Sequence, residues 1–353
     1  MILKVYLIIV VLLVLGCSSK KTSNGVTESS SVEYAEKFGL QGDSLVIYEP
    51  WPGANEPIYY HFDESPEKII VTSTTHLPFL EMLDEEESLV GFPNTRYINS
   101  DIFRKKVANS LIRDVGNDGN LNLELIIDLD PDLLVAFDMG TESAALDKVE
   151  EAGITVLYNS DYLETSALGR AEWIKFFGYV FNKEEKADSV FKEIKIRYDS
   201  LKSLASQVDD PPTVFSGVMY GDTWFLPGGN NWSAQFFKDA GANYLWNDDP
   251  SSGWLEVSFE TVFSKAANAD FWVGTSTFTS LSGLKGQDSR YADFDAFRKE
   301  NVYNYSKRRN PYGGFDYLES GYARPDLVLA DMIHIFHPDL LPDYECYYFE
   351  PIK

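Results

Sequence analysis

KIIVTSTTHLPFLEMLDEEESLVGF, residues 68–92, is the stretch of sequence that decides the fold. Its first part, Lys68–Ser73, has a continuous apolar centre, which is typical of a parallel strand buried on both faces. His76–Leu83 has the length of a short helix, and Leu89–Phe92 is a second apolar strand. A strand, a helix and another strand in this order predict a parallel sheet covered by helices.

The same alternation continues on both sides of a long helical segment. Strand signals stop from Leu168 to Val208, where apolar residues recur at helical spacing until Pro211-Pro212. Alternation then resumes. The expected elements are the helix Asn122–Leu129, the strand Leu133–Phe137, the helix Ser143–Ala152, the strands Ile154–Tyr158, Thr213–Val218 and Phe271–Thr275, and the helices Phe236–Ala240, Phe259–Ala266 and Pro325–Ile335.

Chain length favours two lobes. The sequence has 353 residues, more than the roughly 250–300 at which a single hydrophobic core usually divides. We therefore predict an α/β protein of two lobes with parallel sheets covered by helices, joined by a rigid bridging helix. The expected parts are a signal peptide (1–16), a flexible tether and N-terminal segment (17–41), an N-terminal α/β lobe (42–164), a helical connector (165–208) and a C-terminal α/β lobe (209–351).

The amino terminus predicts export and lipidation. Lys4 precedes the apolar run Val5–Leu15, which is shorter than the roughly 20 residues that a membrane span needs and is typical of a signal-peptide core. Gly16-Cys17 follows and resembles a bacterial lipobox, in which Cys17 becomes the acylated first residue. An uncleaved anchor or a chance cysteine is the alternative. The polar stretch Ser18–Ser31 has too little apolar surface to fold.

Composition excludes one class of partner. The formal net charge is −25, and no cluster of Lys and Arg offsets it, so nucleic-acid binding is excluded. Cys17 and Cys346 are the two cysteines, and lipidation of the first leaves no intrachain disulfide. Aromatic residues make up 14% of the chain, and many lie in segments rich in Gly, Pro and Asn, where aromatics often line ligand surfaces.

Three further stretches, together with residues 68–92, carry a family resemblance. They are NLNLELIIDLDPDLLVAF (120–137), WFLPGGNNWSAQFFKDAGANYLW (224–246) and RPDLVLADMIHIFHPDLL (324–341). The chain resembles the iron-complex and cobalamin class of periplasmic substrate-binding proteins of ABC importers. The resemblance implies a lipid-anchored, periplasmic, monomeric protein without catalytic activity or intrinsic cofactor. Such a protein captures a metal complex between its lobes and delivers it to a permease that works with separate ATPase subunits.

Candidate ligand-binding residues follow from the predicted strands. In open α/β sheets ligands collect at the carboxyl ends of the strands, and hydroxyls, aromatics and arginines there suit an oxygen-rich, partly anionic chelate. The loop Arg308–Phe315 adds positive charge in an acidic chain, although pairing with nearby acids would explain that charge equally well. The candidate set is Thr75, His76, Arg96, Tyr97, Tyr220, Trp224, Trp232, Arg308 and Tyr312, with no protein residue as a direct metal ligand.

The ligand itself stays open at this level. A ferric siderophore-type chelate, with iron(III) as the bound metal, is the first expectation, and cobalamin or another corrinoid and then haem are the alternatives. An extracytoplasmic metal-dependent hydrolase is a candidate of another class, and it requires His76, His334 and His337 to meet in one cleft.

Two glutamates are candidates for permease docking. Glu124 and Glu260 lie at two predicted helix starts, one in each lobe. In the resembled family one exposed glutamate per lobe pairs with permease arginines, and such pairs fix register and speed encounter. The helix dipole, which favours an acid at a helix N-terminus, offers an alternative explanation.

The lipid anchor generates the first prediction. Cys17→Ser removes the thiol that would be acylated, so the protein should leave the washed membrane fraction and be recovered soluble and folded. Immunoblots of both fractions, with circular dichroism of the soluble variant, measure this. Recovery of the variant in washed membranes at the wild-type level would contradict lipidation at Cys17.

Overall fold

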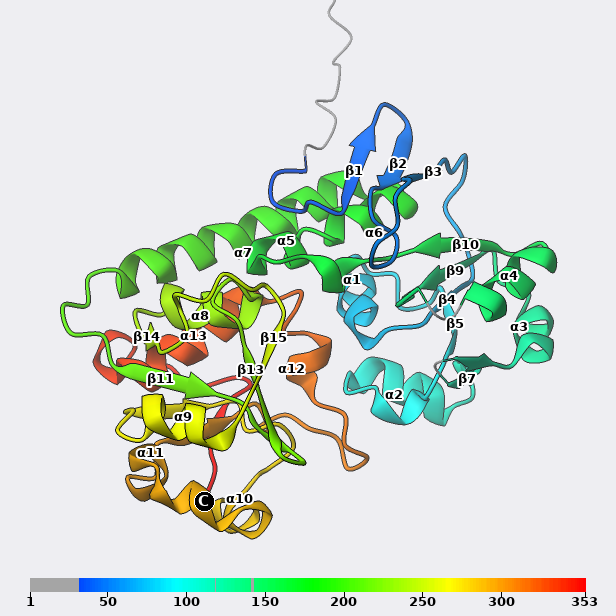
Figure 1. Cartoon of the computed structure of the whole chain (residues 1–353). Helices are drawn as coiled ribbons and strands as arrows, with labels where there is room; N and C mark the ends of the chain where they lie inside the picture. The colour runs from blue at the N-terminus through cyan, green and yellow to red at the C-terminus, as the bar shows by residue number, and fades with distance from the viewer. Residues whose placement is uncertain (1–31, 118, 141–142) are drawn as a thin grey trace, which may run out of the picture.

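Two five-stranded sheets dominate the fold (Figure 1). The computed structural model describes residues 32–117, 119–140 and 143–353. The signal peptide, Cys17 and the stretch 18–31 therefore lie outside the described residues. Helices flank both sheets, and each lobe has its own cluster of buried side chains. The predicted fold class, α/β lobes with parallel sheets covered by helices, is confirmed.

The first sheet has the strand order β10-β9-β4-β5-β6, and all its pairs are parallel. Ile69, Ile70 and Val71 of its central strand are fully buried, as a strand covered on both faces requires. The strands are β4 (Ile69–Val71), β5 (Leu89–Phe92), β6 (Arg113–Asp114), β9 (Leu133–Ala136) and β10 (Thr155–Tyr158), and the helices are α1 (Leu77–Met82), α2 (Asp101–Ala108), α3 (Leu123–Leu129) and α4 (Ser143–Glu151); β7 (Gly116–Asn117) and β8 (Asn120–Leu121) form a small hairpin.

The second sheet has the order β14-β11-β16-β17-β18, in which only the edge strand β18 is antiparallel to its neighbour. A separate antiparallel sheet, β12-β13-β15, lies in the same lobe. The strands are β11 (Thr213–Ser216), β12 (Val218–Tyr220), β13 (Thr223–Pro227), β14 (Asn243–Tyr244), β15 (Trp254–Val257), β16 (Phe271–Val273), β17 (Val302–Asn304) and β18 (Glu350–Pro351), and the helices are α8 (Trp232–Asp239), α9 (Phe259–Ala266), α10 (Leu281–Gln287), α11 (Asp295–Arg298), α12 (Asp316–Glu319) and α13 (Pro325–Phe336).

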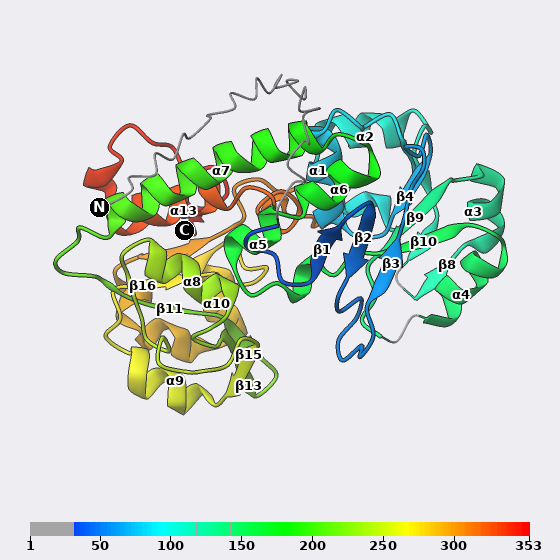
Figure 2. The same cartoon turned by 90° about the horizontal axis from the view of Figure 1, so that it is seen from above.

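Three helices connect the two sheets: α5 (Ala167–Ala171), α6 (Ile174–Val180) and α7 (Glu184–Ala205). The 22 residues of α7 span about 33 Å at about 1.5 Å per residue. Its apolar stripe packs against α6 at one end and against α13 of the second lobe at the other, and Figures 1 and 2 both show α7 running across the two lobes. In the part of the chain that the structure describes, no helix is both long and apolar enough to cross a membrane.

Residues 32–41, the described end of the predicted tether and N-terminal segment (17–41), make specific contacts with the rest of the chain. Strand β1 (Phe38–Gln41) pairs with β2 (Ser44–Ile47), which pairs with β3 (Ile58–Tyr60). The residues before β1 are held by two buried carboxylates. Glu172 accepts hydrogen bonds from the amides of residues 33, 34 and 35, and Glu164 accepts from those of residues 36 and 37. Composition alone does not reveal that distant carboxylates satisfy these amides.

A second contact joins the lobes on the side away from α7. The buried amide of Asn310, in the loop before α12, donates to the carbonyl oxygens of Arg96 (3.0 Å) and Ile98 (2.9 Å) in the first lobe. The Glu319 carboxylate accepts from the amides of Asn99 (2.7 Å) and Ser100 (2.8 Å) at the start of α2. We call these four hydrogen bonds the inter-lobe latch.

The latch predicts a dependence of stability on pH. Burial raises the pKa of the Glu319 carboxyl to about 8, despite the two amides that donate to it. Between about pH 4.5 and pH 8 the folded chain therefore keeps a proton on Glu319 that the unfolded chain has lost. The free energy of unfolding falls as the pH rises through this range, and the contribution of the proton is lost above about pH 8.

Replacing Glu319 by Gln removes the titrating carboxyl group from the latch. From pH 5 to pH 9 the wild type should lose a few kcal/mol of unfolding free energy relative to Glu319→Gln, at about 1.4 kcal/mol per titrated pH unit. Urea unfolding at each pH measures the difference. Parallel pH profiles for the two proteins would contradict the raised pKa.

Candidate ligand-binding cleft

Two adjoining cavities lie where the lobes face each other. The larger has a volume of about 1120 Å³ and the smaller about 420 Å³. Thr277 and Leu318 of the second lobe line both, so the two cavities form one cleft. Ligand sites typically occupy about 300–1000 Å³. The cleft is therefore large enough for a bulky ligand.

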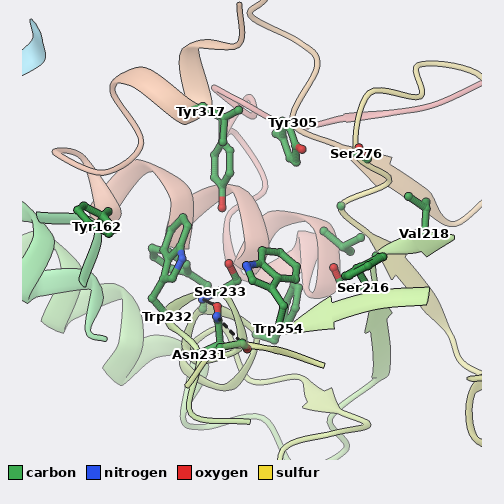
Figure 3. A pocket seen from close by; sticks show the side chains of 18 of the residues that line it. Tyr162, Ser216, Val218, Asn231, Trp232, Ser233, Trp254, Ser276, Tyr305 and Tyr317 are labelled. Carbon is green, nitrogen blue, oxygen red and sulfur yellow. Dashed lines mark hydrogen bonds between the residues drawn. The ribbon is translucent and has the colours of Figure 1, made fainter. Parts of the chain in front are cut away.

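Aromatic residues make up about a third of the residues that line the larger cavity. Figure 3 shows Tyr305 and Tyr317 on one side and Trp232 and Trp254 on the other, all facing the same space. Tyr305 stacks on Tyr317 with ring centroids 4.8 Å apart and an interplanar angle of 19°, and Trp232 is nearly parallel to Tyr317 at 20°. Trp254 is 59% exposed. Such a wall offers flat apolar faces to a large, rigid ligand.

Charge is sparse in this cavity. Among its described lining residues the charged side chains are Arg170 and Glu164. Both are buried, and Glu164 already accepts hydrogen bonds from two N-terminal amides and from the indole of Trp173 (3.2 Å). Burial raises the pKa of Glu164, although these donors oppose the rise. The remaining polar groups are hydroxyls and amides, including those of Asn231, Ser233 and Ser276.

The first lobe supplies strand ends to the smaller cavity. Thr72–Thr74 follow β4, Pro93 and Tyr97 follow β5, and Phe137 follows β9. Met139, two residues further on, reaches the larger cavity. These positions agree with the rule that ligands collect at the carboxyl ends of parallel strands.

The structure divides the candidate residues into two groups. Tyr220 and Trp232 line the larger cavity, and Tyr97 lines the smaller one. Tyr220 is 83% exposed at the rim. The candidates that line neither cavity are Thr75, His76, Arg96, Trp224, Arg308 and Tyr312.

Trp224 is a core residue, which corrects its assignment to a ligand-binding loop. It lies on β13, is fully buried, and packs against Trp272 with ring centroids 5.6 Å apart. Its indole nitrogen donates to the carbonyl oxygen of Ser216 (3.0 Å). The residues after β11 form an antiparallel hairpin that turns through Gly221 rather than an irregular loop, so Trp224 points into the core.

Arg308 lies outside both cavities and pairs with a neighbouring acid. Its Nε donates to the Asp316 carboxylate (2.6 Å), and its guanidinium lies 4.4 Å from the ring centroid of Tyr347. The same loop carries Asn310 of the inter-lobe latch, while Tyr312 is 66% exposed. The positive charge in this loop therefore satisfies a neighbouring acid.

Arg96, Thr75 and His76 serve local packing. The Arg96 guanidinium lies over the ring of Tyr97 and donates to its hydroxyl (2.8 Å). Thr75 and His76 are buried in the turn before α1, where the Thr75 hydroxyl meets that of Ser73 (2.9 Å) and His76 packs on Phe177. The strand end turns inward here, so these two side chains lie behind the cleft.

The histidines do not form a metal centre. His334 Nδ1 contacts the carbonyl oxygen of Leu341 (3.0 Å) and His337 Nε2 that of Gly241 (3.1 Å), both in the second lobe, whereas His76 is buried in the core of the first. Within the described ranges no group of three or more His, Cys, Asp or Glu side chains is arranged to hold a metal ion. The hydrolase alternative lacks the ligand set that it requires.

Sequence reasoning missed most of the aromatic wall. Trp254 follows Ser251-Ser252-Gly253 and lies in a turn-rich segment, so its position outside any periodic pattern was an available signal. The other missed residues lie on elements whose approach to the cleft depends on tertiary structure; they are Tyr162, Arg170, Tyr305, Tyr317 and Tyr322.

Comparison with known proteins identifies the family. A family model described as "Periplasmic binding protein" matches residues 69–308. The chain belongs to this family. It is a substrate-binding protein of the ABC-transporter type, which confirms the resemblance found in the sequence.

Individual relatives agree with this assignment. An uncharacterized lipoprotein of Methanocaldococcus jannaschii is 26% identical over 292 residues, covering 80% of this chain and 68% of that protein. A vitamin B12-binding protein of Vibrio campbellii is 26% identical over 152 residues, covering 43% and 53%. The structure titled as an ABC-type Fe3+-hydroxamate transport system from Saccharomonospora viridis superposes with a TM-score of 0.60 at 18% identity, covering 83% and 98%.

Two tryptophans provide a matched test of the cleft. Trp254→Ala removes an exposed ring from the cavity wall, so ligand affinity should fall about tenfold, or about 1.4 kcal/mol, with little change in melting temperature. Trp224→Ala removes a buried ring and should cost about 3–5 kcal/mol of unfolding free energy. Ligand titration and urea unfolding of both variants separate the two roles. Intact affinity in Trp254→Ala would exclude its ring from binding.

Proposed function

We propose that this protein captures a bulky metal chelate of low net charge, first of all a ferric siderophore of the hydroxamate type, and delivers it to an ABC permease. The observation that carries the proposal is the wall of the 1120 Å³ cavity, which combines many aromatic faces with a single cationic side chain, Arg170, among the described lining residues. A highly anionic chelate, such as a ferric catecholate, would enter a chain of net charge −25 without enough cations to balance it.

A corrinoid is the second candidate. The vitamin B12-binding relative supports it, and so does the large cavity, because a corrin presents a wide planar surface to aromatic side chains. Capture of either ligand would require no catalytic step, and the family relationship supports a binding role without enzymatic activity.

Delivery would use one acidic side chain on each lobe. Glu124 lies in the first turn of α3 and Glu260 in the first turn of α9, and both are exposed. Glu260 lies 3.4 Å from Nη1 of Arg290, an exposed pairing that a permease arginine could replace at low cost. We assign both glutamates to permease docking and the membrane anchor to Cys17. The names of the lipoprotein relatives support an anchored, extracytoplasmic protein.

Ligand titration tests the proposed function. Tryptophan fluorescence of the folded soluble chain should be quenched by a ferric trihydroxamate or by cyanocobalamin with a Kd of about 1 μM or tighter, equivalent to about −8 kcal/mol. A ferric tricatecholate and the metal-free hydroxamate serve as the unfavoured ligands. Failure of every chelate in the panel to bind, or preference for the tricatecholate, would overturn the proposal.

A further inference from the structure

Arg170 occupies an unusual position at the cavity wall. Its guanidinium carbon lies 4.4 Å from the ring centroid of Trp232 and 4.4 Å from that of Tyr322, and these two centroids are 5.0 Å apart, so the rings pack against it from adjoining directions. Nε donates to the carbonyl oxygen of Glu164 (3.0 Å) and Nη2 to that of Tyr162 (2.8 Å). Nη1 is buried and has no hydrogen-bond partner among the residues that the structure describes. The residue is 5% exposed, which makes this a fixed and desolvated cation.

Three phenols line the cavity together with this cation, and that of Tyr322 contacts it directly. Tyr305, Tyr317 and Tyr322 line the same cavity, and Tyr305 stacks on Tyr317, while Trp232 contacts both Tyr317 and Tyr322. Burial raises the pKa of Tyr305 to about 12, with a further contribution from Tyr322. Burial also raises the pKa of Tyr317. Tyr305 and Tyr317 are therefore protonated at neutral pH and can donate hydrogen bonds.

Among the described residues, no acidic side chain forms a direct ion pair with Arg170. The nearby Asp161 is buried, but no hydrogen bond links its carboxylate to Nη1 of Arg170. Burial raises the pKa of Asp161 to about 6, and a hydrogen bond with Thr75 and the charge of Arg170 oppose this rise. A buried cationic donor without an acceptor is unfavourable, so an anionic oxygen brought by a ligand would stabilise the site.

We infer that Arg170, Tyr305, Tyr317 and Tyr322 form a subsite for one anionic oxygen group, a carboxylate or a phosphate, on the chelate that the larger cavity binds. This inference rests on the proposed function and adds a specificity determinant to it. Nη1 has no solvent contact, so a neighbouring group must shift for the ligand oxygen to reach it. The subsite selects ligands that present such a group beside a large apolar surface.

Pairs of ligands that differ in the anionic group test the subsite. The pairs are haem and its dimethyl ester for a carboxylate, cyanocobalamin and dicyanocobinamide for a phosphate, and a neutral ferric trihydroxamate with and without a pendant carboxylate. In a pair that binds, wild type should prefer the anionic member at least tenfold. Arg170→Met should abolish the preference while still binding the neutral member.

Isosteric variants guard against misfolding of the arginine variant. Tyr305→Phe and Tyr322→Phe each remove one hydroxyl and should reduce the preference severalfold with an unchanged melting temperature. Tyr59→Phe, at a tyrosine of β3 that is 59% exposed and lies outside both cavities, should leave the preference intact.

The possible outcomes separate the two proposals. Equal binding of both members of each bound pair, or preference for the neutral member, would overturn the subsite and leave the proposed function standing. A preference that survives in Arg170→Met and in both phenylalanine variants would also overturn it. If no member of any pair binds, both the subsite and the proposed function fail.

Discussion

The spacing of the two lobes depends on α7 (Glu184–Ala205), because one continuous helix packs against both. Its length of about 33 Å sets how far apart the sheets stand, and its packing against α6 and α13 anchors each end in a separate core. Bending it would cost intrahelical hydrogen bonds as well as these contacts. The inter-lobe latch joins the two lobes on the opposite side of the cleft. The cavity between the lobes is therefore a largely preformed volume, whose exposed rim residues are the parts freest to adjust to a ligand.

Buried carboxylates accept hydrogen bonds from backbone amides in segments that lack the regular hydrogen bonds of a sheet or helix. Glu172 and Glu164 hold the segment before β1, and Glu319 holds the start of α2. Asp331 on α13 does the same for the segment before β18, accepting from the amides of residues 347, 348 and 349. Each carboxylate satisfies two or three neighbouring amides at once, which offsets the cost of its burial. Part of the acidity of this chain therefore has a structural purpose rather than a role in solubility.

The sequence predicted what depends on local periodicity. Strand β5 and helix α9 begin and end at the predicted residues, and α7 follows from a stripe that is visible over about six turns. Prediction from the sequence failed where contacts between distant residues determine the position of a side chain. Trp224 and Arg308 looked like loop residues because the hairpin β12-β13 and the partner Asp316 are not apparent in the order of residues. Arg170 looked like one polar residue in a helical connector, since Trp232 and Tyr322 lie far from it in the sequence and reach it only through the fold.

The hydrogen bonds from the amides of residues 33–37 to Glu172 and Glu164 have a mechanical consequence. Glu164 lies three residues before α5 and Glu172 directly follows it, so residues 33–37 are fastened beside the helices that connect the two sheets. A pull applied upstream of residue 33 reaches Glu172 and the connecting helices before it reaches either five-stranded sheet. A protein held by its amino terminus at a surface could thus be pulled and could change its orientation while the width of the cleft between its lobes stays the same.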